Sequence, residues 1–140
     1  MVSHLSGMMA EYLLANEFRS KKRFSLSRYF TNVADDTELN ITDARMRVKF
    51  QRADGKEMEI DVVAESDCGR TVVVESKNSK EPAGPATVTD FLEKAGAYAA
   101  LRPEKQVLPA FFSYGGFTKE AQQYCEENGV AIASRLELFT

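Results

Sequence analysis

Two short segments of the sequence, EIDVV and VVVESK, carry acidic and basic side chains where apolar strands are expected. The three consecutive valines of the second segment are typical of a buried strand, yet they run directly into Glu75 and Lys77. A carboxylate or an ammonium group is costly to bury unless it has a partner. Because side chains alternate between the two faces of a strand, Glu75 and Lys77 share one face. By the same rule, Asp61 of the first segment shares a face with Glu59.

The spacing of these groups favours a metal site. If the two strands form a hairpin around the turn at 67–70, Asp61 and Glu75 become neighbours, and Lys77 stands two residues further along. Two carboxylates beside an ammonium group suit a hard divalent cation, because Mg²⁺ takes oxygen ligands. Such a cation lowers the pKa of water and stabilises charge on a phosphate oxygen, while a lysine can position or deprotonate the attacking water.

Periodicity and turn signals divide the chain into helices and strands. Apolar residues spaced three and four apart predict a first helix that ends in basic residues, and alternation predicts two strands joined by an Asp-Gly turn. The predicted elements are a helix over 3–22, strands over 40–52, 57–65 and 71–77, a helix from Thr87 or Thr89 to 101, a strand over 107–114, a helix from Thr118 to 128 and a strand over 130–133. Residues 24–38 are expected to be irregular. The order αβββαβαβ predicts an α/β fold in one domain, 1–140.

Composition excludes some classes of function. The 44% apolar and 28% charged residues are ordinary for a globular protein, and no apolar run approaches the ~18 residues of a membrane span. The net charge of −3 argues against a strongly basic nucleic-acid-binding coat, although a local basic surface can still attract phosphate. Cys68 and Cys125 lack a metal-binding spacing, and the N-terminus lacks a secretory pattern. We therefore expect reduced thiols in a cytoplasmic protein without a membrane partner.

The same two segments resemble the PD-(D/E)xK nuclease superfamily, which includes restriction-endonuclease-like folds, Mrr-like enzymes and archaeal Holliday-junction resolvases. Its signature is an Asp on one strand and Glu-x-Lys on the next, often preceded by a Glu on the first helix. Asp61, Glu75 and Lys77 match this signature, and Glu11 in MMAEYLLANEF matches the helix position. The later segment SYGGFTKEAQQYCEENGV is similar to the closing strand, turn and helix of Mrr-like members. Ser76 stands where an apolar residue is more usual.

The resemblance implies a fold and an activity. The fold would be a restriction-endonuclease-like αβββαβ core with an added C-terminal helix and short strand, and helices would flank a mixed central sheet. The activity would be that of a Mg²⁺- or Mn²⁺-dependent endonuclease-type phosphodiesterase on nucleic acid, DNA rather than RNA. Asp61, Glu75 and Glu11 would hold the metal, and Lys77 would assist the nucleophile. By analogy, the chain would form a homodimer, and it could belong to a larger protein or complex.

The sequence is compatible with several alternatives. A nuclease-like fold without turnover could serve as a nucleic-acid-binding or assembly module. Glu17 is a rival of Glu11 on the first helix, Glu59 is a rival second carboxylate, and Lys94 could face the site from the helix that follows it.

Candidate contacts to nucleic acid come from two basic stretches. They are Lys21, Lys22 and Arg23 at the end of the first helix and Asn78 and Lys80 after the Glu-x-Lys motif. A basic helix terminus and a plain polar loop are the competing interpretations.

Overall fold

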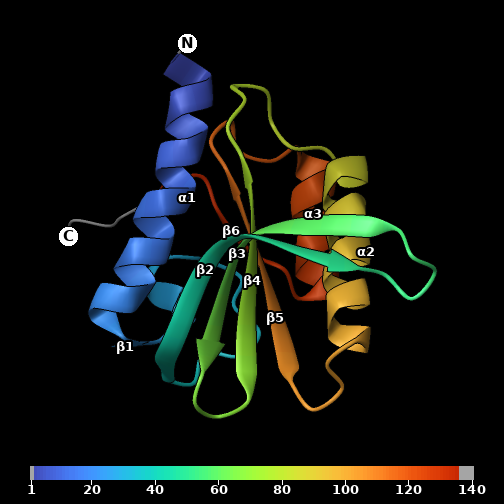
Figure 1. Ribbon diagram of the computed structural model, residues 1–140. Coiled ribbons are helices and arrows are strands. Elements are labelled where there is room, and N and C mark those ends of the chain that lie inside the picture. The colour runs from blue at the N-terminus through green and yellow to red at the C-terminus, as the bar shows by residue number, and fades with distance from the viewer. Residues whose placement is uncertain (1, 136–140) are drawn as a thin grey trace.

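The computed structural model describes residues 2–135, with side chains described from residue 10 onward, and shows a sheet with helices on both faces (Figure 1). The elements in chain order are α1 (Val2–Lys21), β1 (Arg23–Phe24), a 3-10 helix η1 (Leu26–Arg28), β2 (Leu39–Gln51), β3 (Glu57–Ser66), β4 (Arg70–Lys77), α2 (Pro85–Ala100), β5 (Gln106–Ser113), α3 (Lys119–Asn128) and β6 (Ala131–Ala133). None of the described helices is long and apolar enough to cross a membrane.

The six described strands form one mixed sheet in the order β1-β2-β3-β4-β5-β6. The strands from β1 to β4 pair antiparallel, and β4, β5 and β6 pair parallel. Helix α1 lies on one face of the sheet, while α2 and α3 lie on the other (Figure 1). The predicted α/β fold with a mixed sheet flanked by helices, including the added C-terminal helix and strand, is confirmed.

The three valines of β4 are buried because both faces of this central strand are covered. Val72 and Val74 pack into the core beneath α1, and Val73 packs into the core beneath α2 and α3. All three are fully buried. A strand covered on both faces reads as a continuous apolar run, and that is how β4 begins. Its polar end, Glu75–Lys77, therefore extends from a rigid scaffold.

Strands β2 and β3 bend sharply where they pass the end of this core. Ile60 and Val62 are two residues apart, yet Ile60 packs beneath α2 and Val62 packs beneath α1. Opposite them Arg47 has a φ of 54°, a conformation that is uncommon for a side chain other than glycine. Regular alternation through Asp61 was therefore the wrong prediction, because the strand turns over at this residue.

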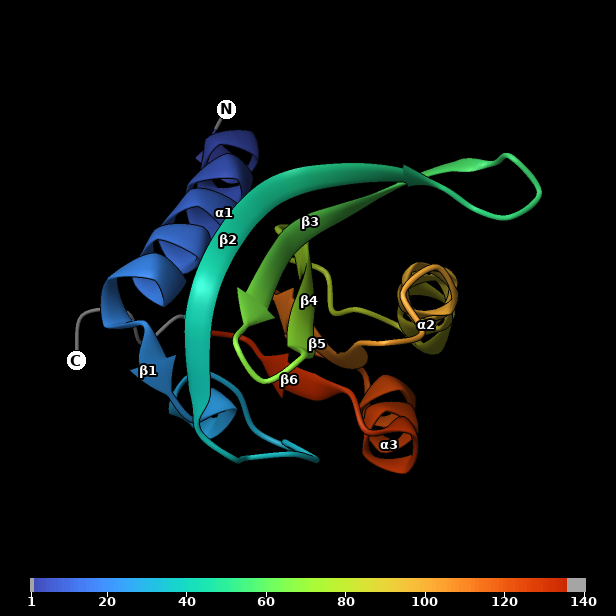
Figure 2. The ribbon, with the colours of Figure 1, turned by 60° about the horizontal axis from the view of Figure 1, so that its bottom comes forward.

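Beyond the bend, the two strands continue as a hairpin that reaches across α2 (Figure 2). Phe50 on the hairpin makes an edge contact with the Tyr98 ring of α2, with the centroids 5.3 Å apart. Arg52 forms an ion pair with Glu93 of α2, with N···O 3.3 Å. The hairpin is thus held to the helix that faces the end of β4.

Three predicted boundaries need correction. Helix α2 begins at Pro85 after Gly84 and is not capped by Thr87 or Thr89, since a proline at the first position needs no N–H partner. The basic residues 21–23, predicted to end the first helix, are divided between two elements, because α1 ends at Lys21 and Arg23 belongs to β1. Residues 24–38, expected to be irregular, also include the short helix η1.

The predicted cap on α3 is confirmed, because Thr118 Oγ1 accepts a hydrogen bond from the Ala121 N–H at 3.1 Å.

The loop after β4 is held by the turn after β5. Tyr114 N–H donates to the Lys77 carbonyl at 2.9 Å, and Ala83 N–H donates to the Gly116 carbonyl at 2.9 Å. Gly115 lies so close to this loop that a Cβ atom would come within 2.5 Å of the Lys80 carbonyl oxygen. The predicted Gly-Gly turn therefore fixes the segment that follows Lys77.

The close approach at Gly115 predicts a stability difference between two glycines. Gly115→Ala is expected to lower the free energy of unfolding by about 1–3 kcal/mol, because the new methyl group overlaps the backbone of the neighbouring loop. Gly96→Ala is the matched control, since Gly96 is exposed inside α2 with nothing near its Cβ position. That change is expected to stabilise by about 0.5–1 kcal/mol. Urea denaturation followed by circular dichroism measures both, and equal effects would contradict the role of the turn.

Candidate active site

The site lies where β3 and β4 separate. Their pairing ends with Val62 opposite Val74, and the next residues along are Asp61 and Glu75. The Ser76 N–H donates to Asp61 Oδ2 at 2.8 Å, so a side chain takes a backbone donor of β4. The Asp61 and Glu75 carboxyl groups interact electrostatically, since the negative charge of Asp61 raises the pKa of Glu75. The structure therefore brings the two predicted carboxylates together.

Lys94 of α2 points at the same pair. Its Nζ donates to both oxygens of Glu75, at 3.2 and 3.0 Å, and both side chains are only 22% exposed. Burial and then the negative charge of Asp61 raise the pKa of Glu75 to about 7, although Lys94 opposes the change. From the sequence, Lys94 is only an alternative, because helix periodicity does not show which turn of α2 faces the end of β4.

Glu11 approaches the pair from α1. Its side chain is 12% exposed and accepts from Arg47 Nε at 3.3 Å. Burial and then the charge of Asp61 raise the pKa of Glu11 above its usual range. The pKa of Asp61 is raised by burial, with a further contribution from the charge of Glu59. Glu11 and Glu59 are therefore electrostatic neighbours of Asp61.

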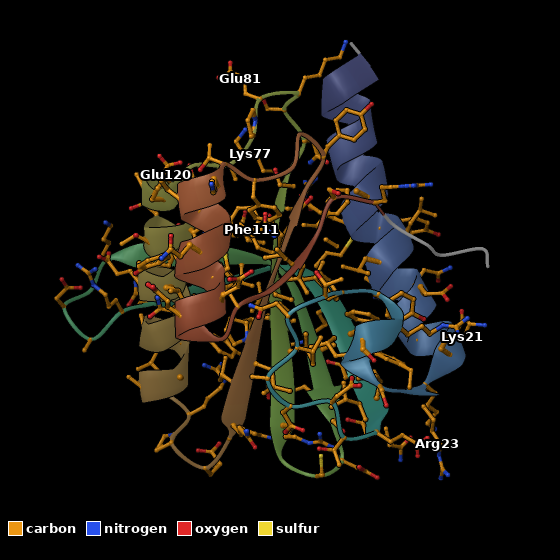
Figure 3. The ribbon with its side chains drawn as sticks, turned by 180° about the vertical axis from the view of Figure 1, so that it is seen from behind. Lys21, Arg23, Lys77, Glu81, Phe111 and Glu120 are labelled. Carbon is orange, nitrogen blue, oxygen red and sulfur yellow. The ribbon has the colours of Figure 1, made fainter. Side chains whose placement is uncertain are left out.

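The two remaining candidates near the site have other partners. Glu17 accepts a hydrogen bond from the Tyr29 hydroxyl at 2.9 Å, which gives this rival of Glu11 a partner of its own. Lys77 follows Glu75 on β4, but its Nζ donates to the Glu81 carbonyl at 2.9 Å. Figure 3 shows Lys77 beside Glu81, in the loop after β4.

The two predicted groups of nucleic-acid contacts lie apart. Lys21 and Arg23 are at the opposite end of the molecule from Lys77 (Figure 3). Asn78 and Lys80 lie in the loop after Lys77, and the Asn78 amide donates to Ser76 Oγ at 3.3 Å.

Arg19, two residues before Lys21 on α1, makes its hydrogen bonds within the protein. Its guanidinium donates twice to the Ala44 carbonyl, at 3.0 and 2.6 Å. It therefore secures α1 to β2.

The donor chemistry of the site fits a divalent cation. Asp61 and Glu75 supply carboxylate oxygens, which are the ligands that Mg²⁺ prefers, and Mg²⁺ is commonly held by one or two carboxylates with water completing its shell. Burial raises the pKa of both carboxyl groups although Lys94 lies beside them, so an added cation would favour their ionised forms. Among the described residues, no cluster of three or more His, Cys, Asp and Glu side chains is arranged to hold a metal. The fit therefore rests on the pair, with Glu11 and Glu59 beyond it.

Comparison with known families decides what kind of domain this is. The family model Mrr_cat, described as restriction endonuclease, matches residues 41–140, which is more than two thirds of the chain. The chain belongs to this restriction endonuclease family. The match covers Asp61, Glu75 and Lys77, so the predicted kinship with the PD-(D/E)xK nucleases and the predicted restriction-endonuclease-like fold are confirmed.

Three solved structures are similar to this Mrr_cat domain. A protein of unknown function, AF1548, is 21% identical over 93% of this chain and 56% of its own, with a TM-score of 0.59. A repair endonuclease from Pyrococcus abyssi is 17% identical over 67% of this chain and 38% of its own, with a TM-score of 0.53. Can2 from Sulfobacillus thermosulfidooxidans, solved with cyclic tetra-adenylate, is 16% identical over 91% of this chain and 32% of its own, with a TM-score of 0.60.

These likenesses concern the fold. The chain spans between 32% and 56% of the length of the three proteins, so each contains a large part with no counterpart here. No curated protein matches the sequence.

The pKa of Glu75 predicts a pH-dependent effect of Glu75→Gln on stability. The folded-state pKa, about 7, exceeds the ordinary value of 4.5, so the folded protein binds the proton more tightly than the unfolded chain does. Wild-type stability should therefore fall as pH rises from about 4.5 to 7, and the loss should persist above pH 7. Glu75→Gln lacks this loss. It is expected to be stabilised relative to wild type by about 1–3 kcal/mol at pH 8 and little changed at pH 4.5.

Urea unfolding at the two pH values measures this difference. Glu104→Gln is the control, because it removes a carboxylate from an exposed position after α2. The control should have the same small effect at both pH values. An equal effect of Glu75→Gln at pH 4.5 and pH 8 would contradict a raised pKa of Glu75.

Proposed function

We propose that this domain is a Mg²⁺- or Mn²⁺-dependent nuclease that hydrolyses phosphodiester bonds in nucleic acid, with DNA preferred over RNA. The observation that carries the proposal is the Asp61 and Glu75 carboxyl pair, held at the parting of β3 and β4 by the Ser76 N–H at 2.8 Å. The chain belongs to a restriction endonuclease family, which supports the same reaction class.

Each residue of the site has a role in this proposal. Asp61 and Glu75 would hold the cation, with Glu11 contributing through a water molecule. When bound, the cation would supply Lewis-acid stabilisation of the charge that develops on the phosphate. Lys77 would orient the attacking water, since its flexible stem lets Nζ leave the neutral Glu81 carbonyl. Attack forms a new P–O bond as the bond to the leaving oxygen breaks.

Arg47 and Ser76 keep the acidic groups in place. Arg47 Nε holds Glu11 from β2, and the Ser76 N–H holds Asp61 from β4. Neither needs to touch substrate to be important, because a metal site requires ligands whose positions are set before the ion arrives.

A role without turnover is the second candidate. The contact that favours it is the hydrogen bond from Lys77 Nζ to the Glu81 carbonyl, which directs the ammonium to a neutral partner. In this role the fold would bind nucleic acid or assemble with a partner.

The same proposal includes the cellular location, the oligomeric state and the larger assembly. Both cysteines, Cys68 and Cys125, are free thiols, which supports a cytoplasmic location. A homodimer would let two sites act on the two strands of a duplex. The partial coverage of the matched structures supports a place within a larger protein or complex.

The first test is cleavage of plasmid and branched DNA in the presence of Mg²⁺. Asp61→Asn and Lys77→Ala are each expected to lower the cleavage rate by at least about 10²-fold, because one removes a carboxylate of the site and the other removes the group that orients water. Asp67→Asn is the matched control, since Asp67 lies in the turn at the far end of the β3–β4 hairpin and bonds to Asn40. Cleavage that survives Asp61→Asn would refute the assignment, and no cleavage by the wild type would favour the binding role.

The second test concerns the two basic groups. Lys80→Gln is expected to weaken binding to a DNA duplex and to reduce the salt dependence of the binding constant by about one counterion, because Lys80 is exposed two residues from Asn78 at the site. Lys21→Gln is expected to change both quantities in the same direction but less, since Lys21 is at the other end of the molecule. Fluorescence anisotropy across a salt series measures both. A larger effect at Lys21 would place the duplex on the opposite end.

A further inference from the structure

The described carboxyl pair already has a cation of its own. Lys94 Nζ contacts both oxygens of Glu75, at 3.2 and 3.0 Å, and Lys94 also acts electrostatically on Asp61. We propose that Lys94 is a positioning residue that orients Glu75 and competes with the divalent cation for it, so that Lys94 sets the metal affinity of the site. This inference rests on the proposed function, because it presumes that the pair holds a metal.

The contact is built into the fold. Helix α2 is fixed on both sides of Lys94, by the edge contact of Phe91 with Phe111 at 5.5 Å and by the edge contact of Tyr98 with Phe50 at 5.3 Å. The backbone of Lys94 therefore cannot move away easily. The four-carbon stem of Lys94 can rotate, so the ammonium is able to leave Glu75 without movement of the helix.

Lys94, rather than Lys77, is the lysine that neutralises the pair. Lys77 Nζ is bonded to the neutral Glu81 carbonyl, whereas Lys94 Nζ is bonded to a carboxylate at low exposure. The two lysines thus have different tasks. Lys94 holds Glu75 before the metal binds, and Lys77 is bonded to the Glu81 carbonyl until it is needed to orient water.

Competition follows from charge. A divalent ion bound to Glu75 would meet the ammonium of Lys94 within a few ångströms, and a like charge at that distance weakens binding unless the ammonium leaves. Loss of the ammonium should therefore strengthen metal binding. Lys94→Gln keeps a donor for Glu75 and removes the charge, so its Kd for Mn²⁺ is expected to be lower than that of the wild type by roughly tenfold or more.

The experiment is a calorimetric titration of the whole chain with Mn²⁺, without nucleic acid. Lys94→Gln should bind more tightly, whereas Lys94→Arg, which keeps the charge, should bind like the wild type or more weakly. Lys105→Gln is the matched control, because Lys105 pairs with Glu65 at 3.4 Å at comparable exposure but away from the site. It should leave the Kd within roughly twofold of wild type. Thermal melting confirms that each variant is folded.

The outcomes separate this inference from the proposed function. If the wild type binds Mn²⁺, Asp61→Asn abolishes binding and Lys94→Gln leaves the Kd unchanged or raises it, the metal site stands and the competition is refuted. If neither the wild type nor Lys94→Gln binds Mn²⁺, both the metal site and the competition are refuted. If Lys94→Arg binds Mn²⁺ as tightly as Lys94→Gln does, the competition is also refuted, because the change in affinity would then not depend on the charge of residue 94.

Discussion

The hydrogen bond from the Ser76 N–H to Asp61 is the contact on which the site depends. Strands β3 and β4 pair as far as Val62 and Val74 and then part, which would leave backbone groups of β4 without a partner. Asp61 supplies the acceptor, at 2.8 Å, and is thereby held beside Glu75. A buried N–H requires a partner, so the parting of the strands and the placement of the carboxylate are one structural event.

The bend in β2 and β3 follows from the same parting. Once β3 leaves β4, the strand face that packs beneath α1 at Val62 packs beneath α2 at Ile60, and Arg47 adopts a positive φ on the outer strand. The hairpin then lies against α2, which carries Lys94. The bend therefore brings together three elements, β3, β4 and α2, that contribute charge to one small volume.

That concentration of charge is unfavourable for the fold taken alone. Burial and mutual repulsion raise the pKa values of Glu75, Asp61 and Glu11, and each raised value reflects a carboxylate that the fold would prefer neutral. Lys94 and Arg47 offset part of the cost, with one cation at Glu75 and one at Glu11. Perturbed carboxyl groups of this kind are characteristic of functional sites, where binding a ligand relieves the repulsion.

The sequence by itself determined the order of most elements, the buried strand VVV and the four acidic and basic positions of the motif, because periodicity and turn residues are local properties of the chain. It also identified the superfamily, through Asp61, Glu75 and Lys77. Only the tertiary structure decided that β3 turns over at Asp61, that Lys94 rather than Lys77 contacts Glu75, and that Glu17 bonds to Tyr29. Each of these contacts depends on how one helix or strand is oriented against another element of the fold. Local sequence patterns do not determine that orientation.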